Sequence, residues 1–207
     1  MKGSMSHRRV GLAAAVVLLA AAPVSGQETG TPLFWAPFRT FEAHELGGTI
    51  SFPSAFDGGT AFEGSYGFGS GNLDIGLRGG FWSPGEGSDT RILVGVHARQ
   101  RVITHSGNFP LDGAAVLGIG AQLVSGSSQL LIPGGLSLGR RLVLEDSEVS
   151  ILPYVQPTLF LAFNDGTDVL FAFGLGGDFR LSRVLEARIS VGLGDVDGVA
   201  LSAVWVH

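Results

Sequence analysis

Short segments that alternate apolar side chains with small or polar ones recur from residue 45 to the end of the sequence. In segment 169–180, every second position from Val169 to Phe179 is apolar or glycine, whereas Asp178 and Arg180 lie at the intervening positions. Successive side chains of a β-strand point to opposite faces, so a period of two predicts a strand with one apolar face. The repeated pattern predicts an all-β fold.

Ten segments follow this pattern, and turns that contain Gly, Asp, Asn and Ser separate them. We expect about ten strands, with eight as the alternative count. The ten predicted strands are 45–52, 62–69, 73–82, 91–102, 114–123, 130–141, 150–162, 169–180, 186–194 and 199–206.

The two faces of these segments differ in composition. One face is almost entirely apolar or glycine, while the other carries many charged side chains. A soluble barrel has an apolar interior, whereas a membrane barrel has an apolar exterior and a polar lumen. Only helices and closed barrels satisfy their backbone hydrogen bonds in lipid. The sequence therefore predicts a closed antiparallel up-and-down transmembrane β-barrel with a lumen charge cluster of Glu45, Glu63, Asp74, Arg78, His97, Arg99, Asp178, Glu186 and Arg188.

The N-terminus has the order of a secretory signal peptide. Lys2, Arg8 and Arg9 precede the apolar run 10–22, and small residues follow up to Gly26. The run is shorter than the ~20 residues that a transmembrane helix needs. We predict that residues 1–26 are removed and that the protein is exported to the outer membrane.

Residues 27–44 do not fit the alternating pattern, and Pro32 and Pro37 interrupt any regular element. Phe34, Trp35 and Phe38 are large and apolar. We expect this stretch to form an N-terminal strap under or inside the barrel, and residues 45–207 to form the barrel domain.

Charge and cysteine content exclude several functions. Cleavage after residue 26 removes three of the 13 basic residues and none of the 18 acidic ones, which leaves a net charge of −8 (10 − 18). A chain of this charge is not expected to bind nucleic acid through its phosphates. The chain has no cysteine, so disulfides and thiol catalysis are excluded.

The sequence contains no recognisable catalytic or metal-binding motif. A Walker loop, HExxH and GxSxG are all absent. His105 and Ser106 lie in a predicted turn, without an acid that we could expect to orient the imidazole. We therefore predict no catalytic residue, no metal, no cofactor and no enzymatic activity.

Two features leave alternatives open. The lumen charges either form a paired, hydrogen-bonded plug or line a selectivity constriction in a pore. Proline cannot donate a ladder hydrogen bond, so Pro133, Pro153 and Pro157 either mark local irregularities or form a lateral seam that could admit an apolar molecule.

The signal peptide and the alternating segments resemble the small outer-membrane β-barrel proteins of Gram-negative bacteria, the OmpA-, OmpX- and OmpW-like barrels. The stretches 113–123, 150–156 and 178–194 are similar to the repeated hairpins of that class. Such barrels usually end in an aromatic residue, whereas this chain ends in His207 with Trp205 two positions earlier.

This resemblance implies an integral outer-membrane protein in contact with membrane lipid, lipopolysaccharide and the outer-membrane assembly machinery. We expect a structural or stress-related protein with a charge-plugged lumen. The alternatives are a narrow porin-like or apolar-ligand-conducting barrel and, by resemblance only, a lipid-modifying outer-membrane enzyme.

The apolar face leads to a first prediction about solubility. The mature protein should require detergent for extraction from membranes, and its gel mobility should change on heating because a closed barrel resists unfolding by detergent. Fractionation followed by electrophoresis of boiled and unboiled samples measures both properties. Recovery as a soluble periplasmic protein without detergent would contradict the membrane assignment.

Overall fold

The computed structural model describes residues 28–39, 44–54, 58–85, 87–144 and 149–206. The predicted signal peptide, residues 1–26, lies outside the described residues, as do residues 27 and 40–43 of the predicted strap. Among the described residues, no helix is long and apolar enough to cross a membrane. The described strands are β1 (Glu45–Pro53), β2 (Thr60–Ser70), β3 (Leu73–Ser83), β4 (Arg91–Ile103), β5 (Asp112–Val124), β6 (Ser127–Gly139), β7 (Leu142–Val143), β8 (Ser150–Phe163), β9 (Thr167–Arg180), β10 (Leu185–Gly194) and β11 (Gly198–Val206).

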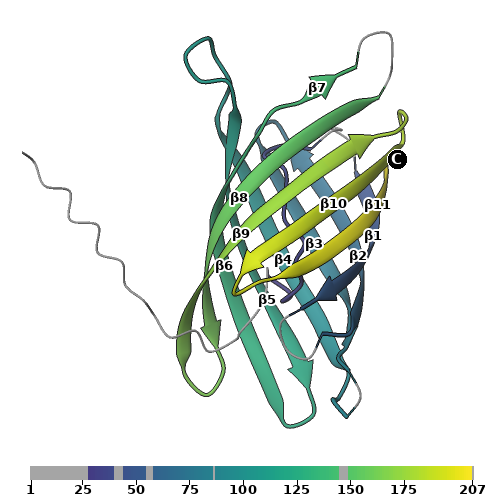
Figure 1. Cartoon of the computed structure of the whole chain (residues 1–207), viewed down its shortest axis with the longest axis vertical. Helices are drawn as coiled ribbons and strands as arrows, with labels where there is room; N and C mark the ends of the chain where they lie inside the picture. The colour runs from purple at the N-terminus through teal and green to yellow at the C-terminus, as the bar shows by residue number, and fades with distance from the viewer. Residues whose placement is uncertain (1–27, 40–43, 55–57, 86, 145–148, 207) are drawn as a thin grey trace, which may run out of the picture.

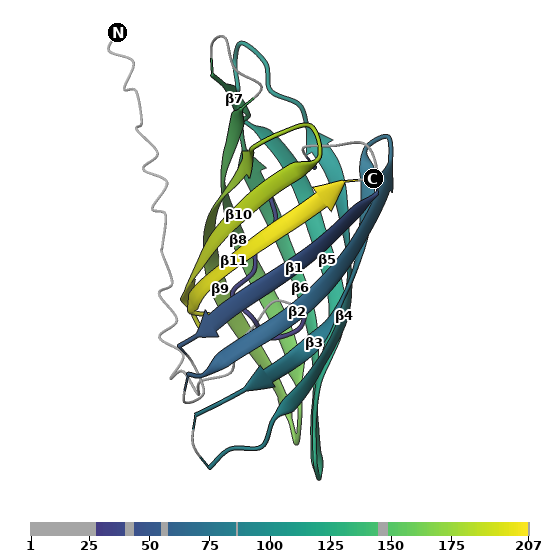
Figure 2. The same cartoon turned by 90° about the vertical axis from the view of Figure 1, so that its right-hand side faces the viewer.

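The ten long strands form one closed antiparallel barrel, in which the strands are tilted relative to the long axis (Figures 1 and 2). Consecutive strands pair with each other, β1 pairs with β11, and β6 pairs with β8. The two-residue strand β7 continues β6 along the edge of β8. The prediction of a closed up-and-down barrel with ten strands is confirmed.

The outer surface of the barrel is apolar. Large hydrophobic side chains with at least half of their surface exposed include Leu77, Leu117, Leu159, Val169 and Trp205. Their neighbours along each strand point inward and include buried charged groups. This is the reverse of a soluble barrel and the arrangement of a barrel that faces lipid.

The barrel has two mouths. We call the end at which β1 begins and β11 ends the terminal mouth, and the other end the opposite mouth. In Figure 1 the terminal mouth is at the top, near the C-terminus and β7. The connections between β2 and β3, β4 and β5, β6 and β8, and β9 and β10 lie at the terminal mouth.

Two prolines of β8 coincide with interruptions in its pairing with β6. The ladder pairs Gly135 with Thr158 and then Leu138 with Val155, so Pro157 falls within a gap. Pro153 is opposite Arg140, where β6 ends before β7 begins. The register is the same on both sides of the gap, so the prolines remove ladder hydrogen bonds without inserting a bulge.

Pro133 affects a different seam from the one that the sequence suggested. Its pairing with Phe160 of β8 is present, but the β5–β6 ladder is interrupted beside it, between Leu117 and Gly120. By contrast, the β8–β9 ladder continues without a gap from Ser150 to Phe163. Strand β6 is therefore interrupted on both sides, and the three prolines do not form one lateral seam.

This difference between neighbouring ladders can be measured by hydrogen exchange in detergent. We expect the amides of Gly118 and Leu136, which lie opposite Pro133 and Pro157, to exchange at least tenfold faster than amides in the centre of β9. The reason is that a missing ladder bond lowers the cost of local opening. Protection of Gly118 and Leu136 equal to that of the central β9 amides would show that the prolines leave the wall intact.

Candidate functional site

The lumen contains a segment of the chain itself. Residues 28–39, which we call the lumenal segment, have no helix or strand, and every residue from Glu28 to Phe38 is buried. Glu28 lies beside Gly95 and Gly120 in the half of the barrel nearer the opposite mouth. Arg39 is bonded to Asp74, near the terminal mouth. The segment therefore runs along the lumen, within the part of the sequence expected to form a strap.

Wall side chains supply hydrogen bonds to the backbone of the lumenal segment. The Trp35 amide donates to Gln156 Oε1 at 2.7 Å, and its carbonyl accepts from Ser137 Oγ at 2.5 Å. Further wall groups donate to carbonyls along the segment: Gln122 to Thr29, Ser190 to Pro32, Tyr154 to Phe34, and Arg99 to Ala36. A buried irregular backbone needs such partners because it cannot form a ladder of its own.

Trp35 of the lumenal segment is buried among cationic and aromatic groups of the wall. Its ring stacks on His97, with the ring centroids 4.1 Å apart. The guanidinium carbons of Arg78 and Arg188 lie 5.7 Å and 6.0 Å from the Trp35 ring centroid. These distances are within the range of cation–π attraction, so a single side chain connects two groups of wall charges.

The first charged group joins Arg78 to two carboxylates. Arg78 donates to Glu63 at 2.6 Å and to Glu28 at 3.3 Å, and Glu28 also accepts a contact from His97 Nδ1 at 3.1 Å. Thr31 of the lumenal segment donates to Glu63 at 2.7 Å. The arginine and both acids are buried, so each charge depends on its partners for stabilisation.

The second charged group is nearer the terminal mouth. Arg188 contacts Glu45 at 2.9 Å, Asp178 at 3.6 Å and also Glu186. Beside it, Asp74 accepts from Arg99 at 3.2 Å and from Arg39 at 2.8 Å.

All nine residues of the predicted lumen cluster point into the barrel and take part in these groups. Three members of these groups, Glu28, Trp35 and Arg39, were not predicted. The sequence placed them in the strap but did not indicate which wall residues they would contact. The aromatic and proline content of the strap was the available signal, but no alternation fixed which side chains would meet the wall.

The lumen is less uniformly polar than the sequence predicted. One side is an apolar cluster in which Phe34 packs with Leu131, Leu152, Phe160 and other buried residues. The inward-facing positions of β8 carry large apolar side chains because these side chains pack against the lumenal segment and not against water. The interior combines a charged part with a packed hydrophobic core.

The expectation that no acid orients His105 was wrong. Asp112, the first residue of β5, lies 2.9 Å from His105 Nδ1. Ser106 Oγ instead accepts a hydrogen bond from the Phe109 amide, so the three side chains do not form a nucleophile–base–acid chain. The described residues also contain no group of three or more His, Asp or Glu side chains arranged to hold a metal ion.

Comparison with known proteins supports the fold. No protein family model matches the chain, and no curated protein matches it in sequence. The β domain of the Bordetella autotransporter BrkA is similar in structure, with a TM-score of 0.51 and 14% identity over 81% of this chain and 100% of that chain. A bacterial polysaccharide outer-membrane secretin (TM-score 0.42, 13% identity, 82% of this chain and 67% of that one) and a de novo designed transmembrane β-barrel (0.37, 11%, 81% and 97%) also match. The likeness to the autotransporter domain shows a barrel fold shared with an outer-membrane protein.

The buried pairs lead to a prediction about stability. Arg78→Ala should lower the free energy of unfolding by about 3–5 kcal/mol, because it leaves the carboxylates of Glu28 and Glu63 buried without their cation. Denaturant titration of the folded barrel in detergent measures the change. Arg78→Met combined with Glu28→Gln and Glu63→Gln should recover part of the loss, since no unpaired charge remains. Unchanged stability in Arg78→Ala would mean that Arg78 is solvated.

Proposed function

We propose that the protein is an integral outer-membrane β-barrel with a structural role, closed to ions by its own N-terminal segment. The observation that carries this proposal is the complete burial of residues 28–38 inside the barrel, with hydrogen bonds to the wall along their length. A barrel of about eight strands has room for packed side chains, whereas water-filled porins have 16 or more. A ten-stranded barrel that also holds a chain segment has little space for water.

The paired charges favour a plug over a selectivity filter. Arg78, Arg99 and Arg188 each have at least one carboxylate partner, so these lumen charges alternate in sign instead of forming a ring of one sign. Ion-selective constrictions use such rings. Because the carboxylates beside these arginines are already engaged in ion pairs, we propose no catalytic step, cofactor or metal for the barrel.

The apolar outer face supports residence in a membrane, and the predicted signal peptide supports export to the outer membrane of a Gram-negative cell. There the barrel would contact membrane lipid and lipopolysaccharide after insertion by the assembly machinery. The resemblance to OmpA-like barrels remains part of this proposal.

A narrow pore is the second candidate, and conductance separates it from a plug. In planar bilayers the intact protein should show no stable channels. The double variant Phe34→Gly/Trp35→Gly should conduct, with at least a tenfold rise in current per inserted barrel, because it removes two adjacent large, buried side chains of the lumenal segment.

The matched control for this experiment is Trp205→Gly, which removes an exposed tryptophan from the outer face and should leave the barrel closed. Stable channels in the intact protein would overturn the plug and favour the porin-like alternative. A closed double variant would show that the lumenal segment is not what blocks the lumen.

A further inference from the structure

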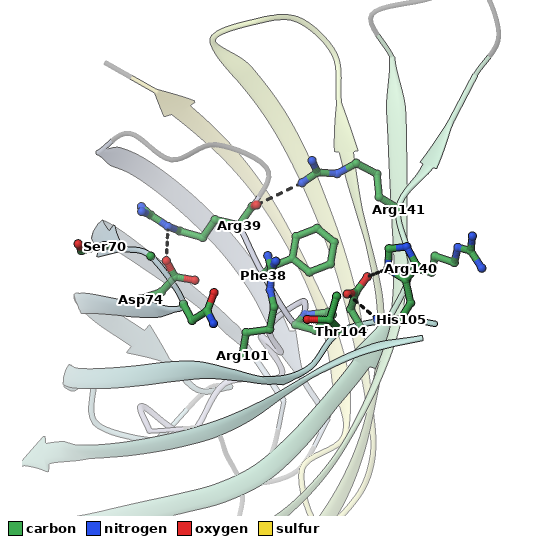
Figure 3. Close-up of a pocket in the computed structure, with 14 residues that line it drawn as sticks. Phe38, Arg39, Ser70, Asp74, Arg101, Thr104, His105, Arg140 and Arg141 are labelled. Atoms are coloured by element: carbon green, nitrogen blue, oxygen red, sulfur yellow. Dashed lines mark hydrogen bonds and ion pairs between the residues drawn. The ribbon is translucent and has the colours of Figure 1, made fainter. Parts of the chain in front are cut away.

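A cavity lies at the terminal mouth, beyond the end of the lumenal segment. It has a volume of about 780 Å³. We call it the terminal vestibule. Pro37, Phe38 and Arg39 line it on the side of the lumenal segment, and the remaining lining residues come from the ends and connections of β2 to β7. Figure 3 shows these side chains around the open space.

The lining of the terminal vestibule is basic. Four arginines (Arg39, Arg101, Arg140 and Arg141) and two aspartates line it, a net charge of +2 (4 − 2) without counting His105. Both aspartates already have cationic or imidazole partners: Asp74 contacts Arg39 and Arg99, and Asp112 contacts His105. The acids therefore do not neutralise the other arginines of the cavity.

Arg101 and Arg141 converge on Phe38. Their guanidinium carbons lie 4.5 Å and 4.9 Å from the Phe38 ring centroid. Among the described residues neither has a carboxylate partner, and the Nε of each has no hydrogen-bond acceptor. Arg141 donates only to the carbonyl of Arg39, at 3.2 Å. Two arginines are thus held at one ring with most of their donors unused (Figure 3).

The electrostatic surroundings of Arg141 are unfavourable for its charge. Burial lowers the pKa of Arg141, Glu186 opposes this effect, and the like charges of Arg180 and Arg101 lower it further. A negative charge placed between Arg101 and Arg141 would offset both desolvation and repulsion.

We propose that the terminal vestibule binds a small oxyanion, a phosphate or carboxylate group, between Arg101 and Arg141. Planar guanidinium groups present paired N–H donors that match the oxygens of these anions. Phe38 holds both cations in position, so little side-chain freedom is lost on binding. Because the lumenal segment lines the inner side of the cavity, the anion binds at the mouth and does not pass through the barrel. This proposal does not depend on the plug having a structural role.

Binding of inorganic phosphate to the purified full-length barrel in a neutral detergent tests the site. Calorimetric titration at constant ionic strength should show saturable binding of about one phosphate per barrel. Arg101→Gln/Arg141→Gln should weaken it at least tenfold. Arg101→Lys/Arg141→Lys should weaken it by a smaller factor, because lysine keeps the charge but loses the planar fork.

Arg91→Gln is the matched control, since Arg91 also lies over an aromatic ring, 5.0 Å from the centroid of Trp82, but at the opposite mouth. It should change phosphate affinity less than twofold. Heat-modifiable mobility verifies that each variant is folded. Absence of saturable binding to the intact protein, or equal binding by the double glutamine variant, would overturn the proposal.

A lipid headgroup carries the same phosphate chemistry as a soluble anion, and nanodiscs distinguish the two sources. If phosphatidylglycerol in place of phosphatidylcholine weakens phosphate binding more than tenfold, both in the intact protein and in Arg91→Gln, the lipid headgroup reaches the site. Equal affinity in both lipids identifies a soluble oxyanion as the occupant.

Discussion

A buried backbone needs hydrogen-bond partners, and in this protein the lumenal segment is where that requirement is hardest to meet. The strands satisfy one another around a closed ring, but residues 28–39 have no ladder. Their backbone is stabilised by side chains of the wall, such as Gln156, Ser137 and Tyr154, that reach inward from neighbouring strands. The position of the segment is therefore specified by hydrogen bonds from the barrel, and the barrel interior is filled by the segment.

The same constraint explains the charged groups. Arg78 would be costly in a dry interior by itself, yet it has one partner on its own wall, Glu63, and one on the lumenal segment, Glu28. Arg99 likewise donates both to Asp74 and to the carbonyl of Ala36. Such contacts contribute little net stability when complete but cost several kcal/mol when one partner is lost. They favour one placement of the segment over others, which a purely apolar filling would not.

The sequence was sufficient to predict the barrel because lipid and lumen impose opposite demands on alternate positions. It also predicted the inward orientation of Glu63, Arg78 and Arg188, because charged residues occur on only one of the two faces of the alternating segments. It could not predict which of these side chains pair, because pairing depends on the curvature of the wall and on the strap. The pair of His105 and Asp112 was missed for a related reason: the seven-residue separation spans a turn, where no periodicity relates one side chain to another.

The inward glycines are a signal that could have located the segment. A Cβ on Gly120 would overlap the Glu28 carbonyl, and one on Gly174 would overlap the Phe34 ring. Gly192 likewise lies against Phe34, at the neighbouring position across the β9–β10 ladder. In a water-filled lumen these positions would tolerate larger side chains, whereas here the absence of a side chain provides the space in which the segment lies. Glycine at inward-facing strand positions of a small barrel therefore indicates that another part of the chain approaches the wall closely.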